Sequence, residues 1–268
     1  MSYLSEHHLL IQDTLTRILE DLCKKEMVDA AELGQFPSPL WEALSETGLT
    51  LTGLPEEHGG SGGDLSDALI VMKGAGKFSA PIPIAENFLG RALCCEFGLP
   101  APKGITTFSH ESFSIAPDGE LIGSASQTAF GRWSDTLVLI AKHGDESFLC
   151  SCPREVFELN ENNNIAGEPR DRVSVKTKLL ADQFVLADGV ARRARLLGAG
   201  LRVAQMSGAL ESMLEMSVSY SMERSQFGKP ISKFQAIQQQ LATMAGEVAA
   251  SMRAAQSIEL SKDLMVEL

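Results

Sequence analysis

Two long helical patterns separated by a short break dominate the last third of the sequence. Leu196 to Arg224 carries small and apolar residues almost continuously, and Ile231 to Leu268 continues in the same way. Gly228-Lys-Pro230 breaks the pattern, because glycine tolerates a left-handed turn and proline cannot continue a helix. Helices this long and apolar must be buried by other helices. The sequence therefore predicts a helical hairpin within a bundle, with part of its burial supplied by another subunit.

The break itself is basic and rich in amides. Arg224 offers a fixed cation with five donors, and Gln235 follows near the start of the second helix. One interpretation is a corner that holds an anionic cofactor. The other is an ordinary helical hairpin in which Arg224 caps backbone carbonyl groups. The spacing of the residues does not choose between the two.

Composition limits the class of protein. The 268 residues are 44% hydrophobic and 22% charged, which is typical of a globular chain with a buried core. The formal charge of −12 argues against a nucleic-acid partner, because phosphate binding needs clustered Lys and Arg. A single local basic site for a small anionic ligand stays compatible with this charge.

The cysteines and histidines predict no metal site. The five cysteines are odd in number and lack zinc-site spacing, and the five histidines are scattered along the chain. Free thiols in a reducing compartment are the interpretation that we favour for the cysteines. The N-terminus shows no signal peptide and no apolar run is long enough to cross a bilayer, so the sequence predicts a cytoplasmic protein.

Periodicity divides the chain into three predicted domains. Residues 1–102 show helical spacing, with a long amphipathic segment around Leu9 to Leu22, a helix capped by Ser38, and another that opens at Asp64 or Ser66. Residues 103–188 show short alternating runs, with hairpin signals at Asp118-Gly119 and Gly144-Asp145. Residues 189–268 are helical again. The fold class is therefore predicted as α+β, with a β-barrel or sandwich domain between two helical domains. The strand-like runs are Phe113 to Ile115, Glu120 to Ile122, Thr136 to Ala141, Ser147 to Cys150, Arg172 to Lys176 and Gln183 to Ala187.

Two separated motifs resemble those of a known family. The first is Tyr-x-x-x-Arg-x-Gln-Phe-Gly-x-Pro-Ile over residues 220–231, followed by Phe234-Gln-Ala-Ile-Gln and Leu241-Ala-Thr-Met-Ala. The second is Trp41-Glu-Ala-Leu-Ser-Glu-Thr-Gly-Leu, then Gly53-Leu-Pro-Glu-Glu-His-Gly-Gly-Ser-Gly-Gly. Together, and in this order, they resemble the acyl-CoA dehydrogenase family, as a short or C-terminally truncated member with an incomplete C-terminal bundle.

This resemblance implies an FAD-dependent enzyme that oxidises the Cα–Cβ bond of an acyl-CoA thioester and passes electrons to an acceptor flavoprotein. It places Arg224 on the FAD diphosphate, Gln226 near the phosphates, Phe227 near the adenosine and Gln235 on the dinucleotide. A core position is an equally good account of Phe227. In the family these residues reach FAD held mainly by a neighbouring subunit, so the resemblance implies a homo-oligomer or a heterotetramer with a second dehydrogenase subunit.

No catalytic base can be identified by this resemblance. The family's base lies either beyond Leu268 or, without gaps, at about Gly198, which cannot abstract a proton. Glu211, Glu215 and Glu247 lie in the right domain, and solvation on a helix surface is the favoured account of them. The methionine stripe of Met206, Met213 and Met216 is interpreted as packing.

The flavin-facing motifs of the β domain are also reduced. Gly104 to Ser112 stands where the family has a Thr-Glu-Pro loop, and Gly123 falls at the expected position of a Trp. Thr106 or Thr107 is the candidate hydroxyl donor to the flavin. Three hypotheses follow from the resemblance: a dehydrogenase whose base comes from elsewhere, a non-catalytic subunit that completes a partner's FAD site, and a flavin-dependent oxidase or monooxygenase of the same superfamily.

Overall fold

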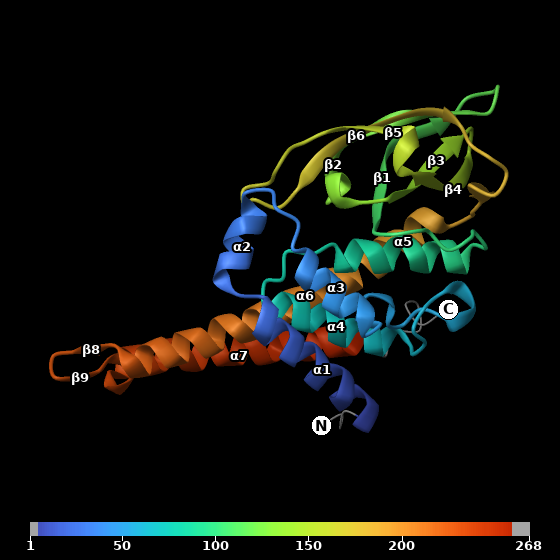
Figure 1. The fold of residues 1–268 in the computed structure, drawn as a ribbon. Helices are drawn as coiled ribbons and strands as arrows, with labels where there is room; N and C mark the ends of the chain where they lie inside the picture. Colours follow the sequence, from blue (N-terminus) through green and yellow to red (C-terminus); the bar gives the residue numbers. More distant parts are fainter. Residues whose placement is uncertain (1–4, 259–268) are drawn as a thin grey trace.

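A layer of helices supports a twisted sheet in the computed structural model, which describes residues 5–258 (Figure 1). Helices precede the sheet in the chain, and a long helical hairpin follows it. The helices are α1 (Glu6–Leu22), α2 (Lys25–Glu32), α3 (Ser38–Glu46), α4 (Leu65–Lys77), α5 (Ile84–Glu96), α6 (Val190–Glu223) and α7 (Gln235–Ile258). The strands of the sheet are β1 (Thr106–Ile115), β2 (Glu120–Ala129), β3 (Thr136–His143), β4 (Glu146–Pro153), β5 (Phe157–Asn160), β6 (Arg170–Lys178) and β7 (Phe184–Leu186). The predicted α+β class is therefore confirmed.

The N-terminal helices begin at recognisable caps. The Asp64 carboxylate accepts hydrogen bonds from the backbone of the first turn of α4, and the Asp67 carboxylate accepts one from the Asp64 N–H, which forms a capping box. Asp64, rather than Ser66, thus caps α4, which begins at Leu65. The predicted cap of α3 is wrong by one residue, because Pro37 takes the cap position and Ser38 is already helical. The short helix α2 has only two turns and was not predicted.

The sheet has the strand order β5-β6-β2-β1-β3-β4-β7. Its neighbouring strands are antiparallel except β1 and β3, which run parallel. Both predicted hairpin turns join consecutive strands, at Asp118-Gly119 and at Gly144-Asp145. Strand β5 was not predicted, since it has only four residues and just one of them is buried. The proposed division at residues 102/103 and 188/189 stays a prediction.

The helices and one part of the sheet share a single apolar core. Val138, Ile140 and Leu149 of the sheet pack in the same cluster as the buried residues of α4, α5 and α6. A second cluster lies within the sheet and contains Phe113, Leu121 and Phe157. Helix α5 lies between the sheet and the other helices, so residues of α5 can face a strand on one side and α6 on another (Figure 1).

Helices α4 and α6 cross with their backbones in direct contact. A Cβ atom built on Gly208 of α6 would lie 2.0 Å from the backbone oxygen of Lys73, and one on Gly76 of α4 would lie 2.0 Å from that of Gln205. No residue with a side chain fits at either position without a backbone shift. The two glycines therefore set how closely α6 approaches the N-terminal helices.

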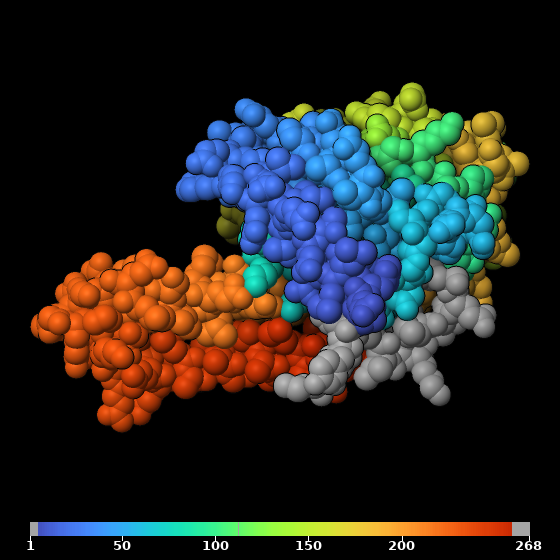
Figure 2. Space-filling view, turned by 60° about the horizontal axis from the view of Figure 1, so that its bottom comes forward, coloured from blue at the N-terminus to red at the C-terminus, as the bar shows by residue number. Residues whose placement is uncertain are grey.

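The far end of α6 and most of α7 project from the rest of the chain (Figures 1 and 2). Helix α6 begins and ends close to the predicted Leu196–Arg224, and α7 covers the part of the predicted Ile231–Leu268 that lies within the described residues. Only Val248 of α7 is buried. No helix in the described part of the chain is long and apolar enough to span a membrane.

Candidate functional site

The break between α6 and α7 forms a tight turn at the tip of the projecting hairpin. Two-residue strands β8 (Ser225–Gln226) and β9 (Lys229–Pro230) pair across the turn. Phe227 and Gly228 both adopt positive φ angles, of 53° and 79°. Glycine tolerates this conformation at no cost, whereas a phenylalanine is strained there. The predicted break is confirmed.

All four residues of the predicted cofactor site gather at this tip and are exposed: Arg224, Gln226, Phe227 and Gln235. The Arg224 guanidinium lies 5.9 Å from the centre of the Tyr220 ring and has no hydrogen-bond partner among the described residues. Phe227 is 92% exposed and meets Phe234 edge to face, with ring centres 6.2 Å apart. Two interpretations are therefore wrong within this chain: Arg224 does not cap carbonyl groups, and Phe227 is not a core aromatic.

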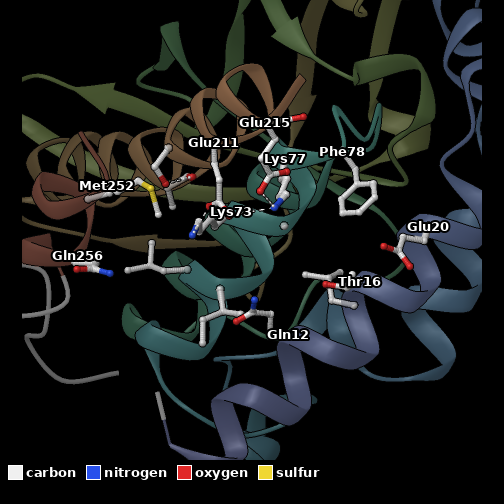
Figure 3. Close-up of a pocket in the computed structure, with 18 residues that line it drawn as sticks. Gln12, Thr16, Glu20, Lys73, Lys77, Phe78, Glu211, Glu215, Met252 and Gln256 are labelled. Atoms are coloured by element: carbon white, nitrogen blue, oxygen red, sulfur yellow. Dashed lines mark hydrogen bonds and ion pairs between the residues drawn. The ribbon is translucent and has the colours of Figure 1, made fainter. Parts of the chain in front are cut away.

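A cavity of about 670 Å³ lies at the other end of the hairpin, between α1, α4, α6 and α7 (Figure 3). Gln12 and Thr16 enter it from α1, and Met252 and Gln256 from α7. Its α4 and α6 walls carry a ladder of ion pairs. The Lys73 ammonium contacts Glu211 at 2.7 Å, and the Lys77 ammonium contacts Glu211 at 3.0 Å and Glu215 at 2.7 Å.

This ladder changes the account of the carboxylates on α6. Burial by itself would raise the pKa of Glu211, but hydrogen bonds and charges from Lys73 and Lys77 outweigh burial and leave the pKa below its ordinary value. Glu211 thus ties α6 to α4, which solvation on a helix surface does not describe, whereas Glu215 pairs with Lys77 and stays exposed on the helix surface as predicted. Glu247 is exposed on α7, as predicted.

A smaller cavity of about 220 Å³ lies where α5, β1, β2 and α6 meet. Its apolar walls include Leu89, Phe108 and Leu201, and Gly198 lies among them. Gly198 is the position at which the resemblance places one alternative catalytic base. The structure therefore shows a cavity at that position and no carboxylate on α6 there.

Charged side chains also line the smaller cavity. Glu86 of α5 is 6% exposed, and its Oε1 accepts a hydrogen bond from the Nη2 of Arg202 on α6. Its Oε2 is buried without a hydrogen-bond partner among the described residues. Arg170 of β6 also lines the cavity and pairs with Glu168 at 2.5 Å. Burial raises the pKa of Glu168, and nearby Glu86 adds to the rise while Arg170 and Arg202 oppose it.

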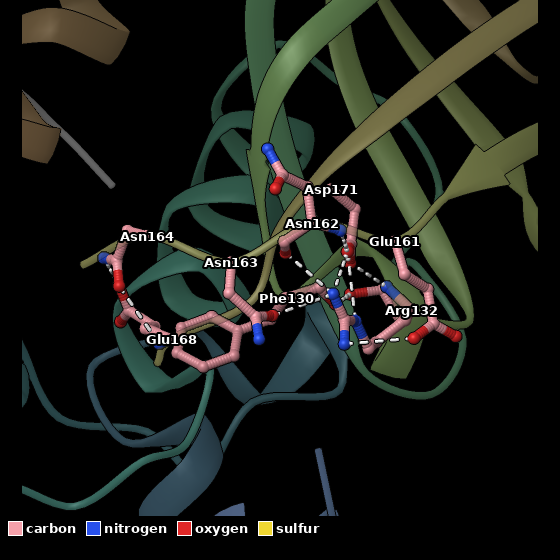
Figure 4. A network of polar contacts seen from close by, with 9 residues as sticks. Phe130, Arg132, Glu161, Asn162, Asn163, Asn164, Glu168 and Asp171 are labelled. Carbon is pink, nitrogen blue, oxygen red and sulfur yellow. Dashed lines mark hydrogen bonds and ion pairs between the residues drawn. The ribbon is translucent and has the colours of Figure 1, made fainter. Parts of the chain in front are cut away.

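The loop that carries Glu168 is fixed by a polar network (Figure 4). Arg132 pairs with the fully buried Asp171 at 2.6 Å and donates to the Asn162 backbone oxygen at 2.7 Å. Asn164 donates to the Glu168 carboxylate at 3.1 Å. These contacts hold the loop between β5 and β6 against the sheet, so Glu168 and Arg170 occupy defined positions beside the cavity.

The flavin-facing role of Thr106 and Thr107 stays a prediction. Thr106 and Thr107 are completely buried, and the Thr107 hydroxyl donates to the Ala129 backbone oxygen. Neither lines the larger or the smaller cavity described above. The residues of β1 that do so are Phe108 to Glu111, and β2 contributes Gln127 and Ala129. Gly123 lies in the middle of β2, paired with Phe113 and Val175, and so does not line the cavity.

The cavity residues come from four separate elements, and spacing along the chain did not reveal them. Glu86, His110, Arg170 and Arg202 are brought together only by the packing of α5, β1, β6 and α6. One local signal was available for Glu86. It stands in the first turn of a helix whose neighbours Ile84, Phe88 and Leu89 are apolar and buried, where a carboxylate needs a partner.

The helical layer, the mixed sheet and the helical hairpin define an α+β fold, and two family models identify the family. The acyl-CoA dehydrogenase N-terminal domain matches residues 5–103, and the acyl-CoA dehydrogenase C-terminal domain matches residues 190–259. These matches cover more than half of the chain, which belongs to the acyl-CoA dehydrogenase family. The resemblance found in the motifs is confirmed.

Individual relatives agree with this assignment. Acyl-CoA dehydrogenase IpdE2 of Mycolicibacterium smegmatis is 29% identical over 262 residues, which cover 92% of this chain and 75% of the relative. The crystal structure of the ChsE4-ChsE5 complex from Mycobacterium tuberculosis superposes with a TM-score of 0.86 at 21% identity, over 97% of this chain and 80% of that one. An FAD complex of PigA superposes with a TM-score of 0.80 at 15% identity, over 97% of this chain and 81% of that one. The two structural likenesses show a shared fold.

Proposed function

We propose that this chain is a subunit of an FAD-dependent acyl-CoA dehydrogenase whose hairpin tip completes the cofactor site of a neighbouring subunit. One observation carries the proposal. Arg224, Gln226, Phe227 and Gln235 gather at an exposed tip, and none of them lines either cavity of their own chain. A ligand that uses them is therefore held mainly by another molecule.

The chemistry of the tip fits FAD. An arginine fork suits a diphosphate, because it donates two parallel charge-assisted hydrogen bonds. The Arg224 guanidinium is exposed at the tip and makes no competing ion pair within the described chain. Gln226 and Gln235 would add amide donors, and the exposed ring of Phe227 offers a flat apolar face to the adenosine part. Bound FAD supplies the hydride acceptor for α,β-dehydrogenation of an acyl-CoA thioester.

The smaller cavity is the proposed place for the acyl group. It lies between the helical layer and the sheet, with apolar walls from Leu89, Phe108 and Leu201. The catalytic base is not among the assigned residues, because Gly198 occupies one family position and Glu86 is engaged with Arg202. A carboxylate outside the described residues, either of this protein or of a partner chain, would abstract the proton at Cα.

Gly198, which brings no carboxylate to the smaller cavity, motivates a second candidate within the same family. In it, this chain is a non-catalytic subunit of a heterotetramer and completes the FAD site of an active partner. The likeness to one chain of the ChsE4-ChsE5 complex supports an assembly of two different subunits. Electron transfer to an acceptor flavoprotein would then be a property of the complex. All five cysteines are free thiols, which supports a reducing, cytoplasmic location.

Flavin retention by the Arg224→Ala variant tests the role of the tip. The purified chain is incubated with FAD, desalted and examined by visible absorption, alone and after co-expression with a full-length family member from the same genome. We expect Arg224→Ala to lower flavin occupancy at least tenfold without loss of helical circular dichroism. Arg172→Ala, an exposed arginine on β6, is the matched control and should keep its flavin.

The same spectra separate the two candidates. Flavin retained by the chain alone supports a homo-oligomer that forms its own sites. Flavin retained only in the co-expressed complex, and lost there with Arg224→Ala, supports the heterotetramer. Equal flavin occupancy of wild type and Arg224→Ala in both preparations would overturn the proposed role of the tip.

A further inference from the structure

Glu86, which lines the smaller cavity, has one carboxylate oxygen without a hydrogen-bond donor among the described residues. Glu86 points its paired oxygen at Arg202, whereas its Oε2 is buried without a hydrogen-bond partner among residues 5–258. The residue is 6% exposed and lines the cavity. A buried carboxylate oxygen that lacks a hydrogen-bond donor is costly, so this site favours a ligand that supplies a donor.

The charges around Glu86 determine what kind of donor fits. Two arginines, Arg170 and Arg202, lie near two carboxylates, Glu86 and Glu168. The pKa of Glu168 responds to the charges of the other three residues. Glu111 of β1 also lines the cavity, but it is exposed and already accepts hydrogen bonds from Ser126 and Gln127. The charges next to Glu86 are therefore balanced before any ligand enters. A ligand carboxylate would add an unpaired negative charge beside Glu86, and an ammonium group would add an unpaired positive charge. An uncharged donor completes the hydrogen bonds without disturbing the balance.

The volume and the walls of the cavity describe the rest of the ligand. About 220 Å³ is somewhat more than the roughly 150 Å³ that accommodates a benzene molecule in an apolar cavity. Leu89, Phe108 and Leu201 provide apolar contact, while Glu86, Arg170 and Arg202 provide polar contact. The space suits one ring or a short branched chain with a single polar substituent.

We propose that this chain selects acyl groups that carry a hydroxyl, and that the hydroxyl donates its hydrogen bond to Oε2 of Glu86. The inference rests on the proposed function, since it takes the smaller cavity as the acyl site. Arg202 acts as a positioning residue, because it holds Oε1 and so directs Oε2. Its second contact, from Nη1 to Gln205 Oε1 at 2.7 Å, fixes the guanidinium in turn.

Binding of two matched thioesters to the full chain tests the proposal. The probes are cyclohexanecarboxyl-CoA and 4-hydroxycyclohexanecarboxyl-CoA, titrated calorimetrically into the FAD-treated protein in the assembly that it forms. We expect the hydroxylated thioester to bind at least tenfold more tightly. A hydrogen bond to a charged group supports a preference of this size, because tenfold corresponds to about 1.4 kcal/mol.

Two substitutions at Glu86 and one control make the result specific. Glu86→Leu removes the acceptor and should abolish the preference, while Glu86→Gln keeps a neutral acceptor and should retain part of it. The Arg202 side chain is 43% exposed and can turn to solvent, so both variants are expected to fold. Glu247→Gln, a carboxylate exposed on α7, should leave the preference unchanged.

The outcomes separate this inference from the proposed function. Equal affinity of wild type for the two thioesters, or a preference that survives Glu86→Leu, would overturn the hydroxyl selection and leave the acyl-CoA site intact. Failure of both thioesters to bind to wild type would overturn the acyl site and with it the inference. A preference in wild type that is lost in Glu86→Leu supports both.

Discussion

The two halves of α6 have opposite surroundings although they form one continuous helix. From Val190 to Gly208 the helix places nine residues in the buried core. Beyond Gly208 only Ser221 is buried, and Met213, Met216, Tyr220 and Met222 are at least half exposed. Both halves are rich in small and apolar residues. Apolarity alone therefore does not determine which half is buried within a single chain.

The difference lies in what each half meets. The first half lies on α4 and α5 with direct backbone contact at Gly208, whereas the second half meets α7 and the tip of the hairpin. A large exposed apolar face marks an interaction surface. We infer that the first half stabilises the chain and that the second half serves assembly and cofactor binding.

The largest effect is expected where the backbones touch. Gly208→Ala places a Cβ 2.0 Å from the Lys73 backbone oxygen, and neither helix can move without disturbing the core. We expect a loss of about 3 kcal/mol or more in the free energy of unfolding, measured by urea denaturation. Gly246→Ala in α7 is the control, because nothing lies within 4 Å of its Cβ position. It should be neutral or stabilise by up to about 1 kcal/mol. Equal stability of the two variants would refute the close crossing of α4 and α6.

A cavity-forming substitution tests the same contrast in the core. Leu197 in the first half is 1% exposed, and Leu197→Ala should cost about 2–5 kcal/mol by removing buried methyl groups. Met213 in the second half is 50% exposed, and Met213→Ala should cost less than about 1 kcal/mol in the isolated chain. Thermal denaturation at several protein concentrations measures both. If the two variants lose similar amounts of stability, and the loss does not depend on protein concentration, the two halves of α6 do not differ as inferred.

A charge on the exposed half should act on assembly and leave the fold intact. Met222 is 62% exposed near the tip, and Met222→Glu would bury an unpaired charge in any interface formed there. We expect the dissociation constant of the oligomer to rise at least tenfold, or about 1.4 kcal/mol, measured by light scattering over a dilution series. Leu180→Glu, at an exposed leucine of the β6–β7 connection, is the control. An unchanged constant for Met222→Glu would place the interface elsewhere.

The sequence predicted the helices and strands better than it predicted which of them pack against one another. Helical and alternating periodicity located α6, α7 and most strands, and Gly228-Lys-Pro230 located the tip between the two helices. Periodicity reports which residues are apolar and does not report what lies against them. The approach of α4 to α6 depends on Gly76 and Gly208, which are far apart in the chain and carry no local signal of contact.

The candidate site was predictable in one part only. The tip residues lie close together in the sequence, so a motif can identify them. The sequence left open whether Phe227 is a core residue, and its exposure answers that question. The smaller cavity depends on Glu86, Arg170 and Arg202, which only the tertiary fold brings together. Thr106 and Thr107 are both fully buried on β1, and their role as hydroxyl donors to a flavin stays a prediction.

The smallest effect is expected from the ion pairs at the boundary between the two halves. Glu211 has a lowered pKa in the folded chain, so its contribution to stability is present above the pKa of the unfolded chain and is lost as pH falls through the folded value. Glu211→Gln should therefore cost about 0.5–1 kcal/mol at pH 7, and the difference from wild type should shrink as the pH falls below about 4. Urea denaturation between pH 3 and pH 7 measures this, with Glu247→Gln as the exposed control that shows no such trend. A difference for Glu211→Gln that is independent of pH would mean that the lysines of α4 do not hold this carboxylate, and the boundary between the two halves would then rest on the glycine contact alone.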